Sequence, residues 1–359
     1  MGEPAGIPGR SHNVFLAHSP FQVFMAGHMI GSMAEFRSAH NRLVIDRVWG
    51  ESETDSAGWD DIVELSPPVG GTVIGAGRRL KAAVSQVVVA LQAADPARLF
   101  LTNIQWPLNN AVLAAVSAEN KRRSVRVCNY PEGIGSLRLV YPTAGQRLRD
   151  LMKRVVGVFN GATYRPIKSD LMGLERCDVI YSLLPHLLPV EVRHKAVAIP
   201  AFPSPTVTVE RDTCIFLGQN DRLLATALRR SVASSAANYC LTLPYKRFRY
   251  KPHHYGQSDV QRQTFLERGF EEIADSRPVE QMLMSQPVAC VASFNSSALV
   301  HLKMMYGERV RCIACFPNLF GRLARSREDR SEAVRSLFER SGVEIMDDTT
   351  ISPGEQLVS

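Results

Sequence analysis

Residues 98–130, RLFLTNIQWPLNNAVLAAVSAENKRRSVRVCNY, contain one full period of the pattern that decides the fold. The apolar run at 98–103 is typical of a buried strand, 107–120 of a helix, and 124–130 of a second buried strand. Two such strands joined by a helix favour a parallel β-α-β unit, because parallel strands need a long crossover connection. The stretch therefore predicts a parallel sheet with helices on both faces.

The same alternation continues on both sides of this unit. Further strands are predicted at 13–17, 42–49, 177–184 and 196–202, and further helices at 20–33 and 78–95. The segment PSPTVTVERD at 203–212 is polar and contains prolines, so it indicates a domain junction.

A second round of the pattern follows the junction. It consists of strands at 213–219, 239–245, 287–294 and 309–316, and helices at 221–237, 278–286, 295–307 and 326–342. The sequence thus predicts an α/β chain with Rossmann-like domains at 1–205 and 206–359. Two doubly wound domains facing one another across a cleft form the GT-B arrangement. That layout serves several reactions, but it directs attention to loops at the carboxyl ends of strands.

The composition supports two soluble domains. At 359 residues the chain is longer than one ordinary core, and its hydrophobic content of 45% and charged content of 21% are typical of globular proteins. No run of about 18 apolar residues predicts a spanning helix, and residues 1–12 lack the features of a secretory signal. Most of the seven cysteines lie in apolar runs, so reduced buried thiols and a cytoplasmic location are expected.

The net charge of +7 implies an acidic partner: nucleic acid, anionic lipid, or a polyanionic or phosphorylated substrate. Basic residues gather at 146–168, on an expected amphipathic helix, and at 245–254, YKRFRYKPHH. Aromatic residues between arginines in the second stretch could stack on bases, but the Rossmann-like organisation argues against nucleic acid. The first stretch is either a binding surface or a solvated helix face.

The loop CNYPEGIGSLR at 128–138 places Glu132 directly after a predicted strand. A solvated turn residue is one interpretation. Gly133 and Gly135, however, would let a bulky substrate approach the backbone. A carboxylate partly withdrawn from water there would be suited to accept a proton from a hydroxyl. Glu132 is therefore a candidate general base, and Gly133 a candidate substrate contact.

The loop KPHHYG at 251–256 is the second candidate. Lys251 supplies a positive charge, and Pro252 restricts the backbone before His253, whose imidazole can donate a hydrogen bond or a proton. A basic surface loop is the alternative. The pair His253 and His254 has no cysteine or carboxylate neighbour at ligand spacing, so no metal site is predicted.

The third candidate is FNSSAL at 294–299, where a strand ends and a helix begins. The unpaired N–H groups of a helix start attract anions, and hydroxyls extend such a site. Helix capping explains one polar residue here but not all of Asn295, Ser296 and Ser297.

A fourth loop, HSPFQ at 18–22, follows the first strand. His18 and Ser19 are expected to face the cleft, with Gln22 on the first helical turn, as candidate substrate contacts. Helix capping is the alternative for Ser19. His186 and His301 are interpreted as structural.

In this order, the first three loops resemble motifs of the bacterial GT-B sialyltransferases and polysialyltransferases. That family has an acidic-Gly motif in its first domain, then a His-Pro motif and a Ser-Ser motif in its second. The matching segments are PEGIGS, KPHH and FNSSAL. LAHSPFQVFMA, VIYSLLP and IFLGQ also resemble family segments, so the likeness extends over most of the chain. The resemblance of IFLGQ implies that Gly218 and Gln219 belong to the site of the nucleotide-sugar donor, together with Lys251 and Asn295.

The resemblance implies that Glu132 deprotonates the acceptor hydroxyl and that His253 assists departure of the CMP phosphate, as an acid or a hydrogen-bond donor. Ser296 and Ser297 would bind that phosphate. Two positions depart from the family pattern: His254 stands where a proline is usual, and Pro131 where relatives are often acidic.

The predicted function is an inverting, metal-independent glycosyltransferase. It would move a nonulosonic acid (sialic acid or a relative) from a CMP donor to a glycan hydroxyl, in capsule or lipooligosaccharide synthesis. A nucleoside monophosphate leaving group needs one proton donor and a positive pocket, without a diphosphate-binding metal. The stretch 146–168 could guide an anionic acceptor or contact the inner membrane. The alternatives are a CMP-Kdo or UDP-sugar transferase, and a non-catalytic glycan- or nucleic-acid-binding protein.

Overall fold

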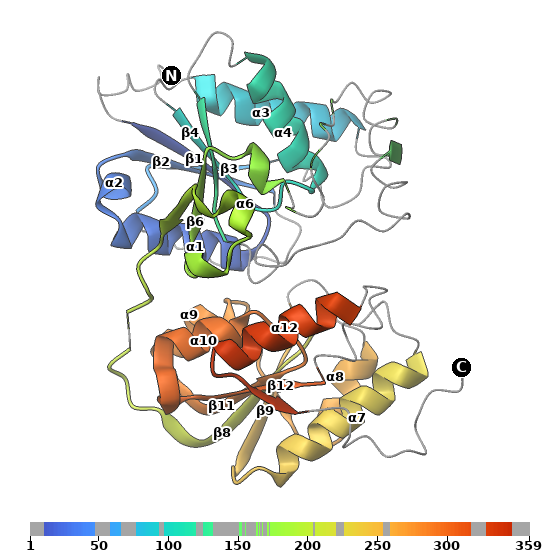
Figure 1. The fold of residues 1–359 in the computed structure, drawn as a ribbon. Coiled ribbons are helices and arrows are strands. Elements are labelled where there is room, and N and C mark those ends of the chain that lie inside the picture. Colours follow the sequence, from blue (N-terminus) through green and yellow to red (C-terminus); the bar gives the residue numbers. More distant parts are fainter. Residues whose placement is uncertain are drawn as a thin grey trace. The chain divides into compact units, whose positions relative to one another are not determined.

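The computed structural model describes two compact units, which divide between Pro200 and Ala201, whereas the sequence places the boundary at 205/206. Each unit has its own parallel sheet covered by helices (Figure 1). The described residues are 11–46, 58–65, 77–92, 97–119, 125–131, 151, 152, 155, 163, 165, 167, 171, 173–203, 205–219, 226–253, 259–316 and 328–346.

The first unit is built on seven parallel strands in the order β3-β2-β1-β4-β5-β6-β7. The strands are β1 His12–Ala17, β2 His40–Ile45, β3 Asp61–Glu64, β4 Ala97–Leu101, β5 Val125–Asn129, β6 Val179–Ser182 and β7 Ala196–Ala198. The helices are α1 Pro20–Ser32, α2 Ala34–Arg37, α3 Gly77–Gln92, α4 Pro107–Glu119 and α6 Val190–Arg193, with short turns η2 Leu174–Arg176 and η3 Pro185–Leu187. Chain order reverses between β1 and β4, so the sheet is doubly wound.

Alternation along β1 explains why helices cover both faces of this sheet. Val14 packs in one core cluster with Leu80 of α3 and Val112 of α4. Phe15, on the opposite face, lies against Phe36 of α2 with ring centroids 6.0 Å apart. Figure 1 shows α3 and α4 on one side of the sheet and α1 and α2 on the other. A strand buried on both faces is a nearly continuous apolar run, as VFLA at 14–17 is.

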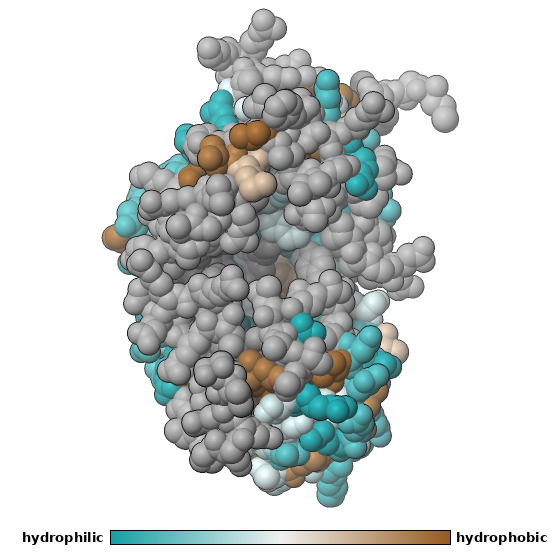
Figure 2. All heavy atoms as spheres, turned by 90° about the vertical axis from the view of Figure 1, so that its right-hand side faces the viewer, coloured by the Kyte–Doolittle hydropathy of each residue, from teal (hydrophilic) through white to brown (hydrophobic). Residues whose placement is uncertain are grey.

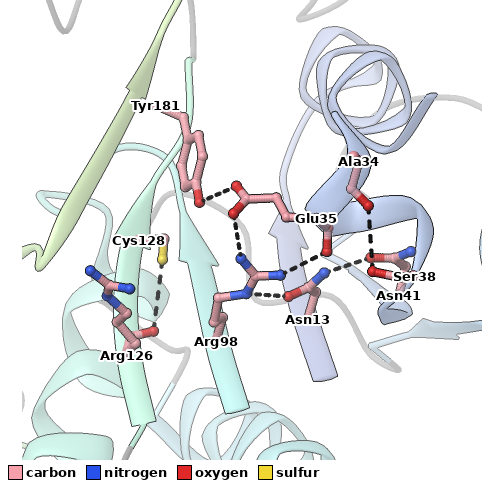
Figure 3. A network of polar contacts seen from close by, with 9 residues as sticks. All are labelled: Asn13, Ala34, Glu35, Ser38, Asn41, Arg98, Arg126, Cys128 and Tyr181. Atoms are coloured by element: carbon pink, nitrogen blue, oxygen red, sulfur yellow. Dashed lines mark hydrogen bonds and ion pairs between the residues drawn. The ribbon is translucent and has the colours of Figure 1, made fainter. Parts of the chain in front are cut away.

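A polar network ties together β1, β2, β4, β6 and α2 (Figure 3). Arg98 of β4 donates to Asn13 Oδ1 at 2.7 Å, and its guanidinium lies 3.5 Å from the Glu35 carboxylate. The Tyr181 hydroxyl donates to the same carboxylate at 2.9 Å, and Asn13 donates to Asn41 Oδ1 at 2.7 Å. Asn13, Asn41 and Arg98 are each the second residue of their strand, so their part of the network braces the amino ends of the sheet, away from the carboxyl edge where ligands bind in such folds.

The second unit repeats the topology with six parallel strands in the order β10-β9-β8-β11-β12-β13. The strands are β8 Glu210–Leu217, β9 Arg247–Lys251, β10 Glu271–Glu272, β11 Val288–Ser293, β12 Arg311–Cys315 and β13 Glu344–Met346. The helices are α7 Thr226–Thr242, α8 Asp259–Leu266, α9 Val279–Ser285, α10 Ala298–Tyr306 and α12 Glu328–Arg340, with the short turn η4 Gly307–Arg309. Chain order reverses between β8 and β11.

One strand prediction is wrong. The sequence predicts a strand at 239–245, but α7 continues to Thr242 and β9 begins only at Arg247. Ala236 and Cys240 are buried and four residues apart, which is helical spacing. In β9, charged side chains alternate with aromatic ones, and this alternation is why its sequence resembles a basic loop.

All seven cysteines are buried free thiols, as the sequence predicts. Burial raises the pKa of Cys128 and of Cys312 to about 12, so neither thiol is a nucleophile at neutral pH. The segment CIAC at 312–315 has the spacing of a redox pair. In a strand, however, residues three apart point to opposite faces, which rules out a shared site.

Candidate functional site

In doubly wound sheets, ligands bind outside the carboxyl ends of strands, where chain order reverses. In the second unit this point lies between β8 and β11, with β9 on the other side of β8. Leu217 of β8 is in register with Lys251 of β9 and with Ser293 of β11, so the three strands end at one level. The structure thus brings three predicted loops to one sheet edge: 218–219, 251–253 and 295–297.

Gln219 joins the loop after β8 to the end of β11 and to α8 through its hydrogen bonds. Its side-chain amide donates to Ser293 Oγ at 3.3 Å, and its backbone N–H donates to Gln261 Oε1 at 3.0 Å. The Tyr250 hydroxyl donates to the same Gln261 oxygen at 2.9 Å. Gln261 is only 1% exposed, so this polar centre is fixed inside the unit and orders the loop after β8.

Position 218 requires glycine because the Tyr250 side chain lies directly against its backbone. Its N–H donates to Lys251 O at 2.9 Å, and a Cβ at this position would collide with the Tyr250 hydroxyl. Tyr250 is fully buried and cannot swing away. The glycine therefore has a packing reason to be present, independent of any ligand.

We expect Gly218→Ala to lower the stability of the second unit by about 1–3 kcal/mol, because the added methyl forces the Tyr250 ring to shift. Thermal unfolding should show a lower Tm. Gly27→Ala in α1 is the matched control: a Cβ there meets nothing within 4 Å, and alanine in a helix interior gains about 0.5–1 kcal/mol over glycine. Equal Tm values for the two variants would contradict the steric argument.

Lys251 is buried, and its Nζ donates to the Asp275 backbone carbonyl at 2.6 Å. Burial lowers the pKa of Lys251, against the opposing effect of the Asp275 and Glu280 carboxylates. In this structure the ammonium braces the segment after β10. Contact between Lys251 and a bound phosphate stays a prediction.

His253 lies two residues after β9 and is partly buried. Burial lowers its pKa to about 4, so the imidazole is neutral at neutral pH. A neutral imidazole presents one N–H donor and one acceptor nitrogen. It can therefore donate a hydrogen bond to an anion without the cost of burying a charge.

The start of α10 has the features of an anion site. The Ser296 hydroxyl accepts from the Ala298 N–H at 3.3 Å, whereas the Ser297 side chain makes no capping bond. Asn295, Ser296 and Ser297 are all partly exposed. Ser296 thus acts as the local cap, and the Ser297 hydroxyl extends the positive end of the helix.

In the first unit, the corresponding point lies between β1 and β4. His18 follows β1 and is fully buried: its Nδ1 is 3.2 Å from Asp46 Oδ2, and its Nε2 is 2.7 Å from Asn109 Oδ1. Gln22 is also buried, and its side-chain oxygen accepts from the His18 N–H at 2.6 Å. Ser19 caps α1 by accepting from the Gln22 N–H at 3.3 Å. These three predicted substrate residues are brought together, but their polar groups bond within the protein.

The predicted base lies beyond the described part of β5. Glu132, Gly133 and His254 are outside the described residues, as is most of 146–168. The strand that precedes Glu132 is well anchored, because Asn129 donates to Leu101 O at 3.0 Å and the Tyr130 hydroxyl donates to Leu16 O at 2.9 Å. β5 thus ends at the carboxyl edge of the sheet, beside the central strand β4.

No protein family model matches this chain, and no curated protein sequence matches it. Solved structures share its architecture. An alpha/beta-galactoside alpha-2,3-sialyltransferase from Photobacterium phosphoreum has a TM-score of 0.53 at 12% identity, covering 94% of this chain and 99% of that chain. The GT-B domain of a sialyltransferase from Photobacterium damselae has a TM-score of 0.51 at 12% identity, with 93% and 99% covered. A UDP-GlcNAc 2-epimerase from Neisseria meningitidis has a TM-score of 0.50 at 6% identity, with 96% of both chains covered.

The chain has the GT-B fold. This confirms the predicted fold class: each unit is a doubly wound parallel sheet with helices on both faces. The GT-B fold is common to the two transferases and the epimerase, so it does not select a donor nucleotide by itself.

Sequence reasoning missed the polar residues that support the GT-B strand ends. Gln261 is a polar residue on the buried stripe of α8, and Asp46 interrupts the apolar run at 42–49. The sequence did contain a signal for both residues: each is a polar residue within an apolar pattern. A buried polar group requires a hydrogen-bond partner, so such a residue indicates a polar contact inside the protein. Thr102, directly after β4, is buried and its hydroxyl has no partner among the described residues.

Metal ligands and membrane spans were also sought in the described ranges. There, no group of three His, Cys, Asp or Glu side chains could hold a metal ion, and no helix is long and apolar enough to cross a bilayer. Leu151, Met152 and Val155, inside the basic stretch, are about half exposed. Figure 2 shows apolar patches among hydrophilic residues on one side of the molecule. Contact of 146–168 with a membrane stays a prediction.

Proposed function

We propose that this protein is an inverting glycosyltransferase that moves a nonulosonic acid from a CMP donor to a glycan hydroxyl in bacterial surface polysaccharide synthesis. The observation that carries the proposal is the common register of β9, β8 and β11, which brings His253, Gly218–Gln219 and Ser296–Ser297 to one sheet edge. These are the loops whose sequences resemble sialyltransferase motifs. The GT-B fold, shared with two solved sialyltransferases, supports the same reaction class.

In this proposal the second unit binds the donor phosphate. The N-terminus of α10 and the hydroxyls of Ser296 and Ser297 offer donors to one phosphate group, as a CMP donor requires. Neutral His253 donates a hydrogen bond to the phosphate oxygen that takes up charge as the glycosidic bond breaks. Binding of the phosphate would in turn raise the pKa of His253 and favour proton donation.

The first unit supplies the base in this proposal. Glu132 accepts the proton of the attacking acceptor hydroxyl, which attacks the face of the sugar opposite the departing CMP. One displacement of this kind inverts the anomeric centre. The donor carries its own carboxylate, in keeping with the net charge of +7.

Nucleotide-specific stabilisation tests the donor assignment. CMP should raise the Tm, because a ligand at a hundred times its Kd stabilises the folded state by about 2.7 kcal/mol. UDP and GDP at the same concentration should not. Incubation with CMP-sialic acid and a panel of glycans should then release CMP and add the mass of one or more sugars. A shift with UDP and none with CMP would instead favour a UDP-sugar enzyme.

A further inference from the structure

Three fully buried polar side chains meet at the carboxyl edge of the first sheet. His18 follows β1, Asp46 follows β2, and Asn109 lies in the first turn of α4, which follows β4. The imidazole bonds to the other two, at 3.2 Å and 2.7 Å. One side chain thus connects the three segments that leave β1, β2 and β4. The Trp106 ring covers it, with centroids 4.9 Å apart.

The proton positions in this cluster follow from the geometry. Asn109 Nδ2 donates to Asn103 O at 2.9 Å, so its Oδ1 faces His18 as an acceptor. His18 Nε2 must therefore carry a hydrogen. A second hydrogen must lie between Nδ1 and Asp46 Oδ2, since two lone pairs facing each other in a buried site would repel. His18 and Asp46 together are then electrically neutral, whichever atom has the shared proton.

We infer that His18 is a positioning residue, which holds together the segments that leave β1, β2 and β4 and does not itself contact substrate. Both ring nitrogens bond within the protein and none of the side chain is exposed, so a substrate has no access to it. The ligand whose binding it would control is the acceptor glycan. The identity of that ligand rests on the proposed function.

The experiment compares His18→Gln with His194→Gln, an exposed histidine of the same unit. His18→Gln can replace only one of the two hydrogen bonds. It should raise the KM for the acceptor glycan at least tenfold, with kcat and CMP binding changed less than threefold. His194→Gln should leave all three unchanged. An unaltered acceptor KM in a folded His18→Gln protein would overturn the inference.

Variants of Asp46 provide the second test. They test the inference even if His18→Gln does not fold. Asn at position 46 supplies its own N–H to Nδ1 and keeps the geometry, whereas Leu cannot. Asp46→Asn should recover acceptor binding at least tenfold over Asp46→Leu. If both variants are equally impaired, His18 acts through charge or proton transfer, and the positioning role is wrong.

A readout independent of activity separates this inference from the proposed function. With ¹⁵N-labelled histidine, the wild-type protein should show the His18 Nε2–H as a downfield ring-proton resonance that disappears in His18→Gln, and a second such resonance if the shared proton lies on Nδ1. Absence of the Nε2–H resonance would overturn the hydrogen-bond assignment even in an active enzyme. Its presence in a protein that neither binds CMP nor transfers sugar would refute the proposed function and leave the cluster intact.

Discussion

Replacing His253 with alanine is expected to lower kcat about a hundredfold or more, with CMP binding weakened much less. A hundredfold corresponds to about 2.7 kcal/mol of lost transition-state stabilisation, in the range of one well-placed donor to a developing charge. The hydrogen-bonding group is already in the required protonation state. Burial keeps the pKa of His253 at about 4, so the imidazole is neutral before the CMP-sugar binds. Steady-state rates of CMP release with saturating donor and acceptor measure the effect.

His253→Asn distinguishes two roles of this residue. An asparagine amide presents an N–H donor but cannot transfer a proton. If His253 acts as a neutral hydrogen-bond donor, His253→Asn should recover at least tenfold over His253→Ala. Activity as low as that of the alanine variant would show that proton transfer, not hydrogen bonding, is what the histidine supplies.

The lowered pKa of His253 also predicts a pH effect on stability. The folded-state pKa of about 4 lies below the ordinary value of 6.5, so the unfolded chain binds the proton first as pH falls. The contribution of His253 to stability is therefore present above pH 6.5 and is lost as pH falls toward 4. Tm measured across this range should fall less steeply in His253→Ala than in the wild-type protein. An unchanged slope would contradict the burial of the neutral imidazole.

Replacing Glu132 with glutamine is expected to lower kcat about a hundredfold or more and leave donor binding intact. Glutamine keeps the size of the side chain but cannot accept the acceptor's proton, and loss of a general base costs about 10²–10⁴-fold. Two measurements check this prediction together: kcat should fall, whereas the rise in Tm on adding CMP should be the same as in the wild-type protein.

Glu64→Gln is the matched control for Glu132→Gln. Glu64 is also a glutamate at the carboxyl end of a strand in the first sheet, but β3 is the edge strand, away from the point where chain order reverses. Its replacement should leave kcat unchanged. Wild-type turnover in Glu132→Gln would remove the general-base proposal, and a non-catalytic binding protein would then be the better description.

The GT-B architecture was predictable because its signal is local and repeated. Parallel strands covered on both faces are nearly continuous apolar runs, so segments such as NVFLA and VACVAS stand out from the helices between them. β9 does not follow this pattern and was not predicted. Arg247 and Arg249 give it a polar face, and it lies beside the short strand β10. Its basic character resembled that of a loop, and the buried turn of α7 around Cys240 was mistaken for the strand.

The candidate site was less predictable, since a loop motif identifies residues without saying which way they point. The common level of Lys251 and Ser293, the strand ends that precede His253 and Ser297, follows from strand register, which no single segment encodes. His18 was expected to meet substrate, yet its partners Asp46 and Asn109 are 28 and 91 residues away. Lys251 likewise bonds to Asp275, on a segment that sequence spacing does not connect to it.

The seven buried thiols can report how often each unit opens to solvent. Cys128 and Cys177 lie in the first unit, and the other five lie in the second. A maleimide can reach them only when the unit around them opens, so labelling rates resolved by peptide mass spectrometry report on each unit separately. A donor-mimicking nucleotide that slows labelling of the later five cysteines alone would locate its binding without any engineered probe.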